Sequence, residues 1–379
     1  MISTVAIVNT LANINPQWRT LSDVQPHRVD GRLRYVTGNA AVTFFVIHEG
    51  REKILKRYTR DNPHLEAIYG KSFLPEELTA FDMTGRSQSV NCLLTDRIDG
   101  VTLDTALCNA APDGIAALAD SFDRMAVRLL ASEYAHGDLK PENIIVTPDG
   151  DMRAIDWDAA FVPELAGSLA IETGTAAYQH PLRTNRMFDK HIDDYSIALI
   201  STMLHAAAVD PATAEHFRLH HEFGVSPRDI ARGERDELTR LTDLFASRGM
   251  ALQYRLARML LSPMPRLFDL ERIMNFAAGR DDNSAIGSNE PASDEQNCLW
   301  GCRAGDRWIV PPLYDTAFEP SEGTILVSLG GYNHFLSLDG RTLRSFGLGD
   351  KAKPFRNGLA SIRRTDGTCQ TITIDEAKG

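Results

Sequence analysis

The chain has 379 residues, of which 43% are hydrophobic and 24% are charged, the proportions of an ordinary globular protein. Its 51 acidic residues outnumber its 40 Lys and Arg residues. The resulting formal net charge of −11 argues against nonspecific nucleic-acid binding, which needs a basic surface. No stretch approaches the roughly 18 consecutive apolar residues of a membrane-spanning helix. Neither nucleic acid nor a membrane is therefore expected as a partner.

The N-terminus and the cysteines favour a reducing, cytoplasmic location. Residues 1–11 are mildly apolar but no Lys or Arg precedes them, so they lack the charged start of a signal peptide. The five cysteines are odd in number and scattered along the chain. Cys298 and Cys302 lie close together, but no second pair and no His cluster accompanies them, which argues against a zinc site.

One break in composition divides the chain. Residues 279–297 read GRDDNSAIGSNEPASDEQN, a polar and acidic run almost without large apolar side chains. Such a run buries too little surface to offset the entropy lost on ordering, so it predicts a flexible linker. Residues 1–278 then form one domain, and residues 298–379 form a second, separable module.

The first domain begins with strand-like runs. The residues of three runs, 32–37, 42–48 and 53–58, are rich in apolar and β-branched side chains, and a turn at 49–52 joins the last two. A fourth run, 90–94, precedes the turn signal Asp-Gly.

From Gly114 the pattern becomes helical. Apolar side chains recur at steps of three and four and mark one buried helix face: Leu118, Phe122, Met125, Leu129 and Leu130. A strand-rich start and a helix-rich continuation predict an α+β domain with two lobes.

The C-terminal module shows a loose internal repeat. Trp300 and the run 309–315 are followed about 33 residues later by residues 332–340, and a partial third copy covers residues 370–375. Short β-like runs with Gly-rich turns at such a period predict a small all-β array of stacked repeats.

Two motifs in the helical part point to chemistry. Residues 136–143 read HGDLKPEN and precede an apolar run at 144–146, and residues 155–158 read IDWD. Their order and spacing resemble the catalytic loop and the metal-binding triplet of serine/threonine protein kinases. The alternative interpretation is a solvent-exposed polar turn that matches the motif by chance.

The resemblance implies a role for each polar residue. Phosphoryl transfer depends on positioning and on neutralising charge. Asp138 is then expected to accept or orient the hydroxyl of the nucleophile, and Lys140 to stabilise charge on the γ-phosphate of ATP. Asn143 and Asp156 are expected to supply oxygen ligands for Mg²⁺.

Two residues of the strand-rich part resemble the ATP-binding elements of that family. Lys56 ends the run Ile-Leu-Lys, similar to the strand whose lysine contacts the α- and β-phosphates, and it alternates with Leu55 of the core. The alternative is an ordinary solvated lysine. Gly38 is the one glycine left of the phosphate-covering loop, with Ala41 in place of the third, so this loop is expected to be stiff.

Lys56 should pair with a glutamate of the following helix. Pro63 favours a helix start, and Glu66 on this helix is the candidate. Glu76 and Glu77 remain alternatives.

Residues 94–100 resemble the hinge between kinase lobes. Backbone groups near Asp96 and Ile98 would bind adenine, with Thr95 at the back of the pocket. The alternative is an ordinary strand that leads into a turn.

Three later segments extend the resemblance, which spans about residues 31–274. Residues 174–181 (GTAAYQHP) look like the end of an activation segment, where a peptide substrate docks. Asp193 looks like the aspartate that binds backbone amides of the catalytic loop, or is simply an acidic residue at a helix N-terminus. Residues 256–274 resemble the last helices of the lower lobe.

The chain also departs from the family pattern. Gly137 replaces an arginine that grips a phosphorylated activation loop, so control by loop phosphorylation is not expected. Trp157 and Asp158 replace the usual phenylalanine and glycine, and Asp158 puts an extra carboxylate near Mg²⁺. Leu182 replaces a glutamate that forms a buried ion pair.

The C-terminal module resembles WG repeats at Trp300-Gly301, 311–315 and 358–360. The resemblance implies a binding or structural module without catalytic residues, with a partner protein as its possible ligand.

The whole pattern predicts an ATP- and Mg²⁺-dependent protein kinase that phosphorylates Ser or Thr of a protein substrate. Two alternatives remain. One is a small-molecule phosphotransferase, because aminoglycoside-type enzymes begin their loop with the same His-Gly-Asp-Leu. The other is a catalytically weak pseudokinase that acts as a scaffold.

Overall fold

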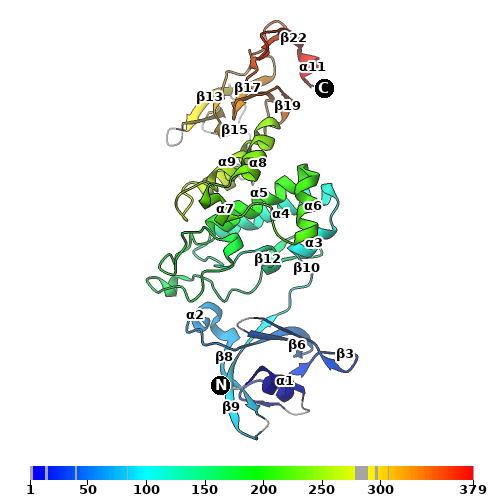
Figure 1. The fold of residues 1–379 in the computed structure, drawn as a ribbon, viewed down its shortest axis with the longest axis vertical. Helices are drawn as coiled ribbons and strands as arrows, with labels where there is room; N and C mark the ends of the chain where they lie inside the picture. Colours follow the sequence, from blue (N-terminus) through cyan, green and yellow to red (C-terminus); the bar gives the residue numbers. More distant parts are fainter. Residues whose placement is uncertain are drawn as a thin grey trace.

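The structure is a computed structural model that describes residues 3–12, 16–38, 41–82, 84–277, 289–294, 298–305 and 307–378. The expected α+β composition is confirmed. Three regions follow one another along the longest axis: a strand-rich region with the N-terminus, a helical body, and a β module with the C-terminus (Figure 1).

The strand-rich region is built on one antiparallel sheet of strands in the order β1-β8-β9-β7-β6-β2, with β5 also paired to β6. Its strands are β1 (Gln17–Trp18), β2 (Gln25–Pro26), β5 (Tyr35–Thr37), β6 (Ala41–His48), β7 (Arg51–Tyr58), β8 (Phe73–Phe81) and β9 (Ser87–Asp96). β3 (Arg28–Val29) and β4 (Arg32–Leu33) form a separate small ribbon. The strands predicted at 42–48, 53–58 and 90–94 are confirmed, whereas the run 32–37 divides between β4 and β5.

The turn between β6 and β7 is tighter than predicted. It consists of Glu49 and Gly50 alone, with φ of 52° and 71°. Positive φ at both central residues matches the right-handed twist of a two-residue hairpin. One face of the hairpin, with Phe44 and Leu55, packs under helix α1 (Thr4–Ala12). The sheet is thereby covered on one face.

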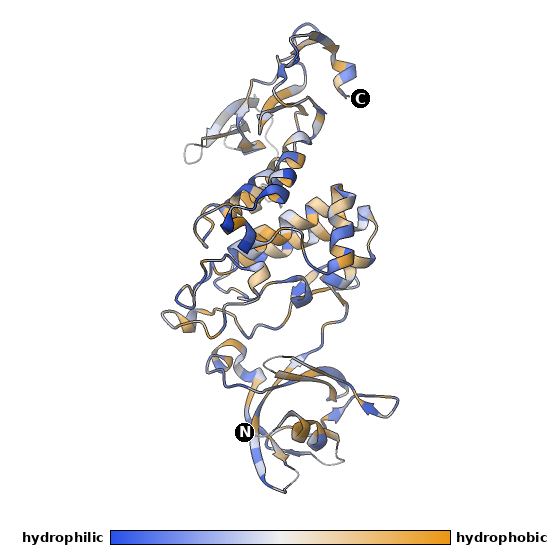
Figure 2. Cartoon of the chain, in the orientation of Figure 1, coloured by the Kyte–Doolittle hydropathy of each residue, from blue (hydrophilic) through white to orange (hydrophobic). Residues whose placement is uncertain are grey.

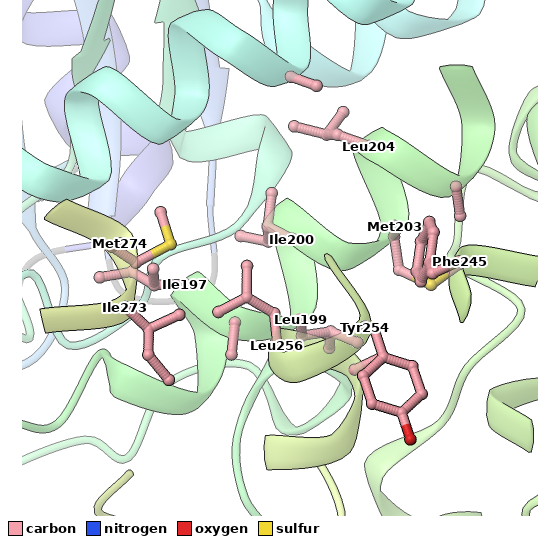
Figure 3. Packing of buried hydrophobic residues seen from close by; sticks show 14 of the residues in the cluster. Ile197, Leu199, Ile200, Met203, Leu204, Phe245, Tyr254, Leu256, Ile273 and Met274 are labelled. Atoms are coloured by element: carbon pink, nitrogen blue, oxygen red, sulfur yellow. The ribbon is translucent and has the colours of Figure 1, made fainter. Parts of the chain in front are cut away.

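The helical body surrounds α5 (Asp194–Val209), which is buried along almost its whole length. The other helices are α3 (Leu103–Asn109), α4 (Pro112–Leu130), α6 (Pro211–His220), α7 (Pro227–Arg232), α8 (Asp236–Ser247), α9 (Ala251–Met259) and α10 (Leu270–Ala277). Figure 3 shows Ile200 of α5 among Leu256 of α9 and Met274 of α10. A short sheet of β10 (Val101–Thr102), β11 (Ile144–Val146) and β12 (Met152–Ala154) lies beside these helices.

The predicted helical stripe lies on α4. Phe122 and Met125 are buried in the core shared with α5, and Leu118, Leu129 and Leu130 pack against the same core. In Figure 2 the apolar colours concentrate in these central helices. The helix packs by this stripe, as its spacing predicts.

In the described part of the chain, no single helix has both the length and the apolar character to cross a membrane. One bent pair, α5 with α6 at 117°, reaches the threshold on length and composition alone.

The described residues of the C-terminal module form three small antiparallel sheets and a final helix. They are β13 (Asn289–Asp294), β14 (Leu299–Ala304) and β15 (Arg307–Tyr314); β16 (Thr316–Ala317), β17 (Thr324–Leu329), β18 (Tyr332–Ser337) and β19 (Thr342–Ser345); and β20 (Lys351–Ala352), β21 (Leu359–Arg363) and β22 (Cys369–Thr373), followed by α11 (Ile374–Lys378). Of the predicted linker 279–297, residues 279–288 and 295–297 lie outside the described residues. The remainder is β13, which pairs with β14.

Steric crowding explains why a glycine follows Trp300. A Cβ on Gly301 would lie 2.2 Å from the carbonyl oxygen of Val310 on β15. The two strands approach each other at an irregularity in their register, which spans Trp300 to Cys302. Only glycine permits this approach without a backbone shift.

The module is docked on the helical body rather than separable from it. Leu313, Leu329 and Tyr332 belong to the same buried cluster as Phe245 and Tyr254 of α8 and α9. This packing does not fit the expected separable module, because removing residues 298–379 would leave Phe245 and Tyr254 without part of their apolar cover.

A polar contact at this interface provides a test. Arg255 of α9 donates to the carbonyl oxygen of Leu313 at 2.8 Å and pairs with Asp315 at 2.8 Å, and its side chain is 14% exposed. Arg255→Ala should lower the free energy of unfolding by about 1–3 kcal/mol, because the carbonyl of Leu313, a buried residue, loses its donor. The matched change on the exposed Arg258 of the same helix should stay within about 0.5 kcal/mol. Urea unfolding measures both, and equal effects would contradict the docking.

Asp194, the first residue of α5, is a buried carboxyl. It is 1% exposed, and one oxygen accepts from the backbone N–H of Leu267 at 3.0 Å. The other oxygen lies 3.6 Å from Nδ1 of His191, too far for a good hydrogen bond. Burial raises the pKa of Asp194 to about 7, an effect that the Leu267 hydrogen bond opposes and that Asp193 reinforces.

This shift makes stability depend on pH. The pKa of about 7 lies above the ordinary 3.8, so between these values the native state holds a proton that the unfolded state releases. The free energy of unfolding should therefore fall as pH rises from about 4 to about 7. Asp194→Asn keeps an acceptor for Leu267, and should be more stable than the wild type at pH 8 by roughly 1–3 kcal/mol. Urea unfolding from pH 5 to pH 8 measures it, with Asp236→Asn as an exposed control. Parallel pH curves for wild type and Asp194→Asn would contradict the assignment.

Candidate functional site

Lys56 lies on β7, between β6 and β9 in the middle of the N-terminal sheet. Leu55 beside it belongs to the core under α1, so strand alternation turns Lys56 to the opposite face. Its side chain is only 11% exposed, and its ammonium group contacts the carboxylates of both Asp156 and Asp158. The sheet and the segment after β12 are therefore joined by an ionic contact around a buried ammonium group.

Asp158 is held by further donors. The hydroxyls of Tyr58 and Tyr69 both donate to its Oδ1 at 2.7 Å, while Lys56 contacts Oδ2. Its backbone carbonyl accepts from the amide of Asn62 at 3.0 Å. All these donors come from the N-terminal region, and together they fix the position of the carboxylate.

Burial and charge set the protonation of this group of residues. Burial alone would lower the pKa of Lys56, but the two carboxylates outweigh it and the pKa is raised. Burial raises the pKa of Asp158, an effect that Lys56 opposes and that Asp156 reinforces. The pKa values of Tyr58 and Tyr69 are raised mainly by burial and also by the charge of Asp158. Both tyrosines therefore keep the protons that they donate.

The loop 136–143 is held from two sides. The carboxylate of Asp193 accepts from the backbone N–H of His136 and, at 2.9 Å, from that of Gly137, which confirms the predicted role of Asp193. The fully buried ring of His136 donates from Nε2 to the carbonyl oxygen of Ile155 at 2.7 Å, and its Nδ1 accepts from the N–H of Asp138 at 3.2 Å. The start of α5 and the end of β12 thus fix the loop.

Three of the predicted residues meet in this loop. One oxygen of Asp138 accepts from the N–H of Thr175 at 2.6 Å, and the other lies 3.3 Å from the amide nitrogen of Asn143 and 3.6 Å from the ammonium of Lys140. Lys140 also donates to the hydroxyl of Thr175 at 3.0 Å. Asp138, Lys140 and Asn143 therefore form one connected cluster with Thr175.

Asn143 and Asp156 are linked through the backbone, because the N–H of Ile155 donates to the carbonyl of Asn143 at 2.9 Å. The amide nitrogen of Asn143 donates to Asp138, which leaves its amide oxygen to bind a cation. The carboxylate of Asp156 is 46% exposed. Among the described residues, no group of three or more His, Cys, Asp or Glu side chains is arranged to hold a metal ion. Two hard oxygens suit Mg²⁺, which keeps several waters and takes phosphate oxygens as further ligands.

The other predicted nucleotide-binding residues lie on the sheet. The N–H of Gly38 donates to the carbonyl of Ala41 at 2.8 Å, and residues 39 and 40 of the predicted phosphate-covering loop lie outside the described residues. Asp96 ends β9, and its carboxylate pairs with Lys53 on β7 at 2.5 Å. Ile98 follows β9 and is half-buried. These contacts do not test whether backbone groups near Asp96 and Ile98 bind adenine, which stays a prediction.

The predicted pairing of Lys56 with a glutamate is wrong for this structure. Glu66 lies exposed on α2 (Leu65–Tyr69), and Glu76 is exposed on β8. Glu77 is 1% exposed, and its carboxylate accepts from the N–H and the hydroxyl of Thr20. The ammonium group of Lys56 contacts two aspartates instead.

The sequence shows Asp158 as an unusual carboxylate, but the two tyrosines that hydrogen-bond to it are not predicted from the sequence. Tyr58 follows Lys56 by two residues on β7, a spacing that puts both side chains on one face of the sheet. That spacing was an available signal. Tyr69 ends α2, whose brevity follows from Gly70, with φ of 52°. Its contact with Asp158 spans 89 positions and no local pattern predicts it.

The backbone conformation explains why position 137 is a glycine. Its φ is +82°, and a Cβ there would lie 2.1 Å from the carbonyl oxygen of Ala159. The guanidinium of Arg183 donates to the carbonyl of Gly137 at 2.9 Å. The backbone around Gly137 thus leaves no room for a side chain.

This crowding predicts a large effect of a single methyl group. Gly137→Ala should destabilise the chain by more than about 2 kcal/mol, because a positive φ and a steric clash act together. Gly150→Ala is the matched control: its φ is +81° with no atom within 4 Å of the new Cβ. It should cost about 1 kcal/mol. Urea unfolding compares the two, and an equal loss would show that the loop adapts.

The chain has no match in two comparisons with known proteins. No protein-family model matches it, and no curated protein matches it at a significant level. The geometry of the site, together with the resemblance of its motifs, is what a functional proposal can be built on.

Proposed function

We propose that the chain is an ATP- and Mg²⁺-dependent protein kinase that transfers the γ-phosphate to Ser or Thr hydroxyls of a protein substrate. The observation that carries the proposal is the contact between Lys56 and Asp156, which lie 100 residues apart. It puts the lysine of one kinase-like motif against the aspartate of another. In this proposal the N-terminal sheet and the helical body are the two lobes of a kinase fold.

The cluster around Asp138 supports the assignment of the reacting centre. A catalytic aspartate must be held within reach of the acceptor hydroxyl. Thr175 and Asn143 both donate to its carboxylate, whose side chain is still 23% exposed. Asp138 would orient the hydroxyl, and Lys140, 24% exposed, would stabilise charge on the transferred phosphate.

The nucleotide would be bound from both sides. Lys56 would contact the phosphates from the sheet, and Asn143 and Asp156 would hold Mg²⁺ from the helical body. When bound, Mg²⁺ would neutralise the charge on the phosphates. Asp156 contacts Lys56 through one carboxylate oxygen, so a cation taken up by Asp156 would compete with the lysine for the charge of this carboxylate.

A protein substrate is favoured over a small molecule by the segment 174–181. Thr175 contacts both Asp138 and Lys140. Gly174 has φ of +76°, and a Cβ there would lie 2.5 Å from the carbonyl of Gly137. The segment therefore packs directly beside the reacting centre, where an acceptor peptide would dock.

A scaffold without activity is the second candidate. It is favoured by one observation: two carboxylates already neutralise Lys56, and one of them is Asp156. Melting temperatures with ATP, in the presence and absence of Mg²⁺, separate the candidates. A kinase should show a metal-dependent rise, and an inert scaffold none.

Two substitutions test the proposed roles. Asp156→Ala should reduce phosphate transfer to a few per cent or less because the metal loses its carboxylate ligand.

Asp138→Asn should lower turnover by roughly 10²–10⁴-fold, with the KM for ATP within about threefold, because Asp138 serves the transition state. Labelled ATP, a protein mixture and identification of the phosphorylated residue type provide the measurement.

Asp149→Asn, on the exposed turn between β11 and β12, is the control and should leave transfer unchanged. Loss of ATP binding in Asp138→Asn with an intact fold would give this residue a nucleotide-anchoring role. Absence of transfer by the wild type, together with no melting shift, would contradict the kinase proposal itself.

A further inference from the structure

Lys56 has two carboxylate partners that differ in character. Asp156 has φ of +65° and a side chain that is 46% exposed, so it remains open to ligands. Asp158 is 17% exposed and also accepts hydrogen bonds from Tyr58 and Tyr69. One carboxylate is available for exchange, and the other is fixed by the sheet region.

From this difference we propose that Asp158 is the positioning residue for Lys56: it keeps the ammonium group in place when Asp156 turns to a cation. The proposal rests on the proposed function and deepens it. Asp158 acts through Lys56 and does not itself touch the nucleotide or the metal.

The two tyrosines make this role possible. Tyr58 lies on the same strand as Lys56, and the ammonium lies 5.3 Å from the centre of its ring. Tyr69 reaches Asp158 from the end of α2. An aspartate side chain is short, and two phenol donors fix the oxygen that Lys56 does not use.

Lys56 depends on Asp158 because helix α2 offers it no carboxylate. The helix has five residues and its glutamate, Glu66, is exposed. α2 thus supplies Tyr69 in place of a carboxylate, and it influences Lys56 indirectly, through Asp158. A shift of α2 that broke the Tyr69 contact would loosen Lys56.

A double-mutant cycle on nucleotide binding tests the proposal. The affinity of the full chain for ADP with Mg²⁺ is measured by calorimetry for the wild type, Asp158→Asn, Lys56→Met and the double variant. Asp158→Asn should weaken binding about tenfold, the scale of one charge-assisted hydrogen bond. The double variant should match Lys56→Met within about twofold, because Asp158 acts only through Lys56. Losses that multiply would overturn the proposal.

A magnesium titration tests the main alternative, in which Asp158 is itself a ligand of the metal. The Mg²⁺ concentration at half-saturation should rise in Asp156→Asn and stay unchanged in Asp158→Asn. Tyr69→Phe should weaken ADP binding severalfold, and the exposed Tyr134→Phe should not. A raised Mg²⁺ requirement in Asp158→Asn would assign this residue to the metal and overturn the positioning role.

A measurement without nucleotide separates this proposal from the proposed function. The rate at which an amine-reactive reagent labels Lys56 at one fixed pH is followed by mass spectrometry. It should rise severalfold in Asp158→Asn and less in Asp156→Asn, because Asp158 is the firmer anchor. If the wild type binds no nucleotide but this order holds, the kinase proposal fails and the anchoring stands. The reverse order would overturn the anchoring whatever the nucleotide does.

Discussion

The contact of Lys56 with two carboxylates joins the parts of the molecule on which the site depends. It is the place where the N-terminal sheet meets the segment after β12 through the buried ammonium group of Lys56. A charge withdrawn from water needs a close partner, since desolvation alone is costly. Lys56 therefore constrains where β7, α2 and residues 156–158 can lie. The loop 136–143 is then aligned with them through Ile155, which hydrogen-bonds to both His136 and Asn143.

Local patterns predicted much of the fold and part of the site. Runs of apolar and β-branched residues predicted β6, β7 and β9, and helical spacing predicted α4, because both signals lie within one element. The loop 136–143 was predicted from motif resemblance, and the hydrogen bonds of Asp193 to it were confirmed. Polar residues a few positions apart can be predicted to lie together, because one turn of the chain brings them together.

Other features depend on contacts between distant segments, which no local pattern contains. The partner of Lys56 was expected on the next helix, but α2 is short and exposes Glu66. The carboxylate that replaces it comes from residue 158, held by tyrosines of the sheet region. In the same way, the polar run before the β module suggested independence, whereas Leu313 and Tyr332 share a core with α8 and α9. Linker composition describes the linker and not the interface between the elements on either side.

The docking of the β module has a geometric consequence for any protein that it binds. A module on a flexible tether samples many positions and raises the local concentration of its ligand over a wide volume. A module packed on α8 and α9 would present any ligand in one orientation, at the opposite end of the long axis from the N-terminal sheet (Figure 1). If the proposed kinase function holds, a bound protein would reach Asp138 only if an extended part of its chain spans the helical body. The spacing between binding epitope and acceptor residue, rather than the acceptor sequence alone, would then select the target.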